Sequence, residues 1–136
     1  MPQKIIILTA GHGGSDPGAA SLDGRFIEAR EAVALRDRVA RQLREAGAPV
    51  ITDGERGQNW PLREALKLIR RPGLLPLEIH FNAGPATASG VEVLAIPGLA
   101  KPSRAIARTV SESLGLPLRG DGGWRPDSAG QHHRLA

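Results

Sequence analysis

Three side chains that lie far apart along the chain have the chemistry of a metal site. His12 stands among glycines in the stretch LTAGHGGSDPGA, directly after an apolar run, and His80 stands near the end of another such run. Glu28 lies four residues before Ala32 on the expected apolar stripe of a long helix, where an unpaired carboxylate is costly. Two imidazoles, one carboxylate and an open fourth position form the ligand set of a catalytic zinc site.

The elements that must position these residues alternate between strands and helices. Apolar runs predict strands over 4–10, 49–52, 74–83 and 90–97, and helical spacing predicts helices over 26–47, 61–71 and 103–115. This alternation predicts an α/β fold, a single domain whose largely parallel twisted sheet is flanked by helices on both faces. Ligands of such sheets bind beyond the carboxyl ends of the strands, so His12, His80 and the start of the first helix should share one rim.

The same patterns predict which side chains face inward. In the strand over 74–83, Glu78 and His80 share one face. The expected stripe of the 26–47 helix consists of Ala32, Leu35, Val39, Leu43 and Ala46. The 103–115 helix should have Ser103 as its N-cap and Ile106, Val110 and Leu114 as its stripe. Residues 118–136 have the composition of a loop.

Other interpretations of the three residues remain open. A glutamate in a first turn often interacts only with the helix dipole, and a histidine at a strand end is often only hydrogen-bonded. The glycines around His12 could instead belong to a phosphate-binding loop of a nucleotide-binding module. That stretch, however, lacks the lysine of a P-loop and the G-x-G-x-x-G spacing.

Composition restricts the chemistry further. The chain has 136 residues and no cysteine, which excludes disulfides, thiolate ligands and a cysteine nucleophile. Any metal must therefore be held by histidine, aspartate or glutamate. The net charge of +4 indicates an anionic partner such as a wall polymer, a membrane surface or a nucleic acid, with a solvated arginine surface as the alternative.

Several motifs together carry a family resemblance. ILTAGHGGSDPGA, the glutamate that opens a helix ending in AG, IHFNA and GVEVL occur in this order over most of residues 4–96. RPDSAGQHHRLA follows near the end. Their order and spacing resemble those of the zinc-dependent N-acetylmuramoyl-L-alanine amidases of the amidase-3 group, which include bacterial wall hydrolases and phage endolysins.

The resemblance implies that His12, Glu28 and His80 bind one zinc ion. It implies hydrolysis, through a zinc-activated water, of the amide between N-acetylmuramic acid and the L-alanine of the stem peptide in peptidoglycan. Asp16 is a candidate to orient His12, with a turn-forming role as the alternative. Asn82 is a candidate to face the substrate.

The chain departs from the family pattern in two places. Where the family has an arginine after the second strand this chain reads TDGER, so Arg56 is the candidate replacement. The general acid/base of the family, a glutamate on a later strand, has no counterpart before Ala136. We therefore expect residues 1–136 to be an amidase-3-like catalytic domain without its C-terminal strand and helix. His132 and His133 are the remaining candidates for the acid/base, unless they belong to a surface loop. A non-catalytic zinc-holding domain that binds or regulates peptidoglycan is the alternative function.

The N-terminus shows no secretion signal, and no apolar stretch is long enough to cross a membrane. We expect a protein that is made in the cytoplasm, acts on the cell wall after release and works as a monomer without nucleic acid. The 11 prolines and the scarcity of asparagine and glutamine fit a thermophile.

Overall fold

Strands and helices alternate along the chain. The computed structural model describes residues 3–129, and the chain divides into two units, Met1–Ala83 and Gly84–Ala136. Among the described residues, every pair of neighbouring strands is parallel, and within each unit helices lie between the strands in sequence. The predicted α/β class is therefore confirmed.

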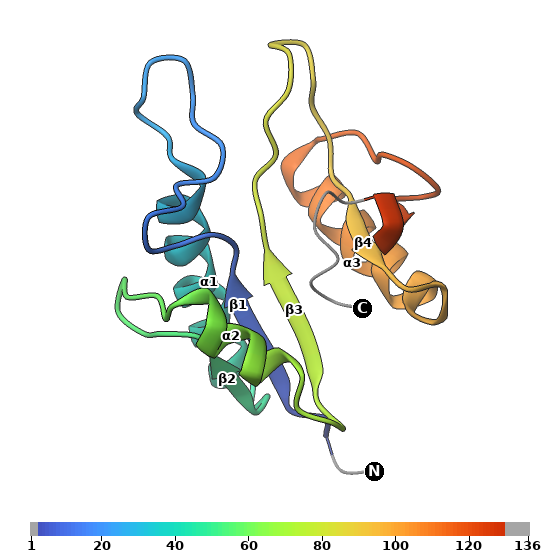
Figure 1. Cartoon of the computed structure of the whole chain (residues 1–136). Coiled ribbons are helices and arrows are strands. Elements are labelled where there is room, and N and C mark those ends of the chain that lie inside the picture. Colours follow the sequence, from blue (N-terminus) through green and yellow to red (C-terminus); the bar gives the residue numbers. More distant parts are fainter. Residues whose placement is uncertain (1–2, 130–136) are drawn as a thin grey trace. The chain divides into compact units, whose positions relative to one another are not determined.

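The first unit is built around a three-stranded sheet with the order β2-β1-β3 (Figure 1). Its elements are β1 (Ile6–Ala10), α1 (Glu28–Glu45), β2 (Val50–Thr52), α2 (Leu62–Ile69) and β3 (Leu75–Ile79). β1 is central, because it pairs with β2 on one side and with β3 on the other. A parallel strand that helices cover on both faces has a continuous apolar run, which is what the sequence predicts for this segment.

The two helices of this unit cover opposite faces of the sheet. Ile7 of β1 packs against Leu68 and Ile69 of α2, whereas Ala10 packs against Ala32 of α1. Side chains at odd and even positions of a strand point to opposite faces, so these two clusters lie on the two sides of β1. Helices on both faces are therefore found in this unit, as predicted.

The inward face of α1 differs from the predicted stripe. Ala32 is buried as expected, but Leu35 is 38% exposed and Ala46 is also exposed. The buried positions are instead Glu28, Ala32, Val33, Arg36 and Ala40. An arginine can occupy such a face only when other elements bring it hydrogen-bonding partners, and the segment after β2 does so here.

The second unit contains a two-stranded parallel sheet with a helix against it. Its elements are β4 (Val93–Ala95), the 3-10 turn η1 (Pro97–Leu99), α3 (Ala100–Leu114), β5 (Trp124–Pro126) and η2 (Asp127–Ala129). The expectation that residues 118–136 form only a loop is wrong, since β5 lies there. Contacts of Trp124 hold this strand in place. Its indole N–H donates to the carbonyl of Ala95 in β4, and the guanidinium of Arg104 in α3 lies 5.4 Å from its ring centroid.

α3 also differs from the sequence prediction. It begins at Ala100, so Ser103 is a buried residue of its first turns rather than its N-cap. Its buried residues are Ser103 and Ala107, whereas the predicted stripe of Ile106, Val110 and Leu114 is 41%, 37% and 63% exposed. Small side chains allow a helix to approach a short two-stranded sheet closely, which favours Ser103 and Ala107 at this contact. Within residues 3–129, no helix combines the length and the hydrophobicity needed to cross a membrane.

Candidate metal centre

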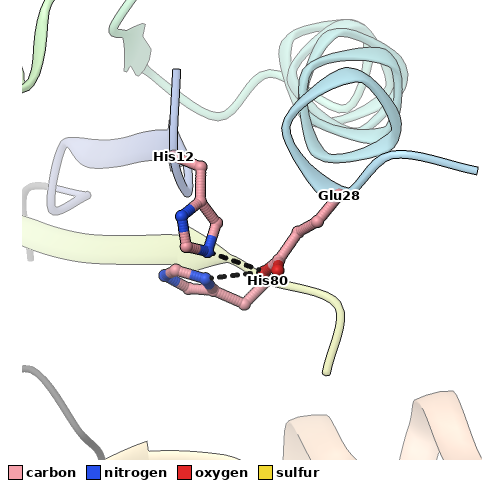
Figure 2. Close-up of side chains that lie close together, drawn as sticks. All are labelled: His12, Glu28 and His80. Carbon is pink, nitrogen blue, oxygen red and sulfur yellow. Dashed lines mark hydrogen bonds and ion pairs between the residues drawn. The ribbon is translucent and has the colours of Figure 1, made fainter. Parts of the chain in front are cut away.

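The three predicted ligands meet at the carboxyl edge of the first sheet. His12 follows β1, His80 follows β3 directly, and Glu28 is the first residue of α1. One nitrogen or oxygen from each lies within 4.8 Å of those of the other two. Figure 2 shows both imidazoles directed at the carboxylate of Glu28. All three belong to the first unit, so the cluster is complete within it.

His12 is held by the tight turn that follows β1. Its Nδ1 lies 2.8 Å from Oδ2 of Asp16, and its Nε2 lies 3.2 Å from Oε1 of Glu28. Oδ1 of Asp16 also accepts a hydrogen bond of 3.0 Å from the amide of Gly18. The structure thus gives Asp16 the contacts for both predicted roles, orienting His12 and closing the turn.

Gly18 is required at its position by geometry. It has φ +67°, and a Cβ there would lie 2.6 Å from Cδ2 of His12 and 2.7 Å from Oε2 of Glu28. Only glycine adopts this backbone conformation without strain and leaves the space that both ligands occupy.

Glu28 is 6% exposed and is fixed mainly by backbone amides. The amide of Ala19 donates to Oε2 at 2.9 Å, and the amide of Phe81 donates to Oε1 at 3.0 Å. Burial alone would raise the pKa of Glu28, but these two hydrogen bonds and that of His80 together outweigh it and lower the pKa. The carboxylate is therefore ionised and pre-oriented towards the two histidines.

His80 lies between two carboxylates. Its Nδ1 is 3.0 Å from Oε1 of Glu28, and its Nε2 is 2.7 Å from Oε1 of Glu78. The hydrogen bond to Glu78 raises the pKa of His80, although burial opposes this shift. The ring also passes so close to Gly11 that a Cβ there would lie 2.3 Å from it. The lack of a side chain at Gly11 therefore leaves the space that the His80 ring occupies next to β1.

Glu78 was not predicted to take part in the site. Its side chain is 6% exposed, and its Oε2 accepts a hydrogen bond of 3.1 Å from the hydroxyl of Thr9. The sequence does place Glu78 on the same face as His80, two residues earlier in the strand. A carboxylate inside an apolar run, in phase with a predicted ligand, is the signal that would have identified it.

The other predicted site residues are two exposed side chains and two histidines outside the described part of the chain. Arg56 is exposed, and Asn82 is exposed just beyond His80. The role of Asn82 towards substrate stays a prediction. His132 and His133 fall outside the described residues. Glu92, to which the sequence assigns no role, accepts a hydrogen bond of 3.1 Å from Arg125 in the second unit.

The donor set fits zinc. Two imidazole nitrogens and one carboxylate oxygen are typical zinc ligands, and three of them leave a position for water or substrate. Each imidazole has a carboxylate at its other nitrogen, Asp16 for His12 and Glu78 for His80. Zinc-binding histidines usually donate their second N–H to such a partner. The side chain of His80 is 38% exposed, so the cluster is open to solvent on one side.

Two histidines beyond the strand ends and a glutamate at the start of a helix, on an α/β fold, form a donor set that is typical of metal-dependent hydrolases. The sequence model of the N-acetylmuramoyl-L-alanine amidase family (Amidase_3) matches residues 6–128, and the chain belongs to this family.

Solved structures and one curated relative show similarity over much of the chain. The crystal structure of a candidate N-acetylmuramoyl-L-alanine amidase from Neisseria meningitidis is 41% identical, with a TM-score of 0.80 over 97% of this chain and 72% of that chain. AmiC2 of Nostoc punctiforme, at 20% identity and a TM-score of 0.77 over 97% of this chain and 72% of that chain, shows the fold alone. The uncharacterized protein YqiI of Bacillus subtilis is 34% identical over 90 residues, which span 65% of this chain and 43% of YqiI.

Proposed function

We propose that this protein hydrolyses the amide bond between N-acetylmuramic acid and the L-alanine of the peptidoglycan stem peptide, with one zinc ion held by His12, Glu28 and His80. The observation that carries the proposal is the convergence of these three side chains within 4.8 Å in a member of the amidase family. The Neisseria meningitidis structure, at 41% identity, supports the same activity.

His12, Glu28 and His80 would hold a zinc ion, which would lower the pKa of a bound water from about 15.7 towards about 7 and polarise the scissile carbonyl. The protein prepares the ligands for it. With zinc bound, Asp16 would accept the Nδ1 proton of His12 and leave its Nε2 lone pair for the metal. Glu78 would likewise accept the Nε2 proton of His80 and leave its Nδ1 lone pair for the metal. Asp16 and Glu78 are thus the groups of this chain that would set the two tautomers.

Amide hydrolysis also requires a proton for the leaving nitrogen. Glu78 accepts a hydrogen bond from Thr9 and contacts His80, and Glu92 accepts one from Arg125. This engagement favours a second candidate function, a zinc-holding domain that binds peptidoglycan without cleaving it. His132 and His133 remain the candidates for the acid/base in the catalytic alternative.

Digestion of purified sacculi by the zinc-loaded protein tests the activity. Cleavage of the proposed bond releases stem peptides with a free amino group on L-alanine, which mass spectrometry detects. Glu28→Gln should abolish release because it removes the anionic ligand. Glu31→Gln is the matched control: it lies in the same first helical turn but pairs with Arg30 outside the cluster, so it should leave the activity unchanged.

The result also separates the two candidate functions. A wild-type protein that holds one zinc per chain, binds sacculi and releases no stem peptide would contradict hydrolysis and support the binding domain. Release at the same rate by Glu28→Gln would contradict the metal assignment instead.

We also propose that the protein is made in the cytoplasm and acts on the wall after release, as a phage lysin does. The resemblance to a group that includes phage endolysins supports this proposal. Cells that express it should lyse only after their membrane is permeabilised; lysis without permeabilisation would contradict the proposal.

An origin in a thermophile predicts a melting temperature above the roughly 45–65 °C typical of mesophile domains.

A further inference from the structure

Arg36 of α1 is fully buried, and every one of its donors has a partner. Its Nε and Nη2 donate to Oδ1 of Asp37 at 3.0 and 2.8 Å, and Nη2 also donates to the carbonyl of Gln58 at 2.6 Å. Its Nη1 donates to Oδ1 of Asp53 at 2.8 Å and to Oδ1 of Asn59 at 2.7 Å. A guanidinium has five N–H groups in a rigid fork, and these five contacts use all of them.

Two of these partners continue to the strand that carries His12. Both carboxylate oxygens of Asp53 lie 3.3 Å from the amide of Ala10. The Nδ2 of Asn59 donates to the carbonyl of His12 at 2.9 Å. Arg36 is therefore connected to the backbone on both sides of Gly11, where β1 ends and the metal-site turn begins.

The backbone at His12 needs such a restraint. Its φ is +65°, in the left-handed region that residues with a side chain seldom adopt. A residue persists in such a conformation only when its surroundings over-determine it. The hydrogen bond from Asn59 acts on the carbonyl of this same residue.

We infer that Asn59, held in place by the buried pair of Arg36 and Asp53, is a positioning residue for the metal ligand His12. The inference rests on the proposed metal function. Asp16 orients the imidazole, and Asn59 holds the backbone from which the imidazole extends. The contacts of Arg36 with Asp37 and Gln58 already join α1 to the segment after β2, so a purely structural role would be served without the bond to His12.

The test compares Asn59→Ala with a matched control. Arg44→Met removes another link between α1 and the same segment, because Arg44 binds Glu55 and the carbonyl of Val50, but this link does not lead to His12. The zinc dissociation constant is measured by competition with a chromogenic chelator, and thermal unfolding of the zinc-free proteins gives their stability. Asn59→Ala should weaken zinc binding about tenfold, the lower end of the range for groups that orient ligands. Arg44→Met should change it less than twofold.

Hydrogen exchange provides a readout that general loosening would not reproduce. In Asn59→Ala the amides of residues 11–14 should exchange faster, whereas in Arg44→Met they should exchange as in the wild type. Arg36→Lys is a second variant: a lysine lacks the planar fork, so it should reproduce both effects of Asn59→Ala with a larger loss of stability.

Each other result overturns the inference. Unchanged zinc affinity in Asn59→Ala would contradict the inference and leave the proposed function intact. An equal loss of affinity in Asn59→Ala and Arg44→Met would do the same. A wild-type protein that binds no zinc would overturn both the inference and the proposed metal function.

Discussion

Replacing Gly18 with alanine tests whether the ligands are held as closely as the structure indicates. An added Cβ would lie 2.6 Å from Cδ2 of His12 and 2.7 Å from Oε2 of Glu28, whereas an ordinary contact begins at 3.4 Å. One or both ligands must therefore move by about 0.8 Å, since 3.4 minus 2.6 is 0.8. Ligand distances in zinc sites vary by only about ±0.2 Å. We therefore expect zinc affinity to fall at least about 100-fold, beyond the usual effect of changing a supporting group.

Gly24→Ala is the matched control for this change. Gly24 has φ +68°, against +67° for Gly18, but a Cβ there would meet nothing within 4 Å. Both variants should therefore lose about 1–2 kcal/mol of unfolding free energy through left-handed strain. Only Gly18→Ala should also show the fall in zinc affinity.

Chelator competition measures the affinity and chemical denaturation of the zinc-free proteins measures the stability. Equal zinc affinity in the two variants would refute the reasoning, because it would mean that His12 and Glu28 are free to yield.

Three further predictions follow from other contacts. Glu78→Gln keeps the shape of the side chain but replaces an anionic acceptor with a neutral one, so zinc affinity should fall about tenfold with little change in stability; unchanged affinity would mean that Glu78 does not orient His80. The hydrogen bond to Arg44 lowers the pKa of Glu55, so this pair stabilises the fold above the unfolded-state pKa of Glu55 and loses its effect as the pH falls through the lower folded-state value. The pair is half exposed, so Glu55→Gln should cost at most about 0.5 kcal/mol at pH 7 and nothing at pH 2 in denaturation experiments; a cost that persists at pH 2 would exclude the ion pair as its source. Binding to purified sacculi should weaken as salt rises if the net charge of +4 recruits anionic wall polymers; binding that is independent of salt would make the basic surface incidental.

The sequence by itself predicted that His12, Glu28 and His80 meet at the site. His12 and His80 follow apolar runs, and Glu28 opens an amphipathic helix between them. Parallel strands with helical connections bring their carboxyl ends to one edge, so position along the chain is enough to predict that these residues converge. The glutamate on an apolar stripe added a second signal, because a carboxylate there needs partners.

Only the tertiary structure decided what holds these residues in place. The helical pattern assigns Arg36 no inward role, yet it is buried among groups from the segment after β2. Glu78 contacts His80, and Asn59 binds the carbonyl of His12. The local sequence around Glu78 and Asn59 does not specify either contact. The energy of a buried charge depends on partners brought from distant segments, and periodicity within one element contains no information about those partners. The same reason explains α3, where the contact with a two-stranded sheet placed Ser103 and Ala107 inward and left the more apolar stripe exposed.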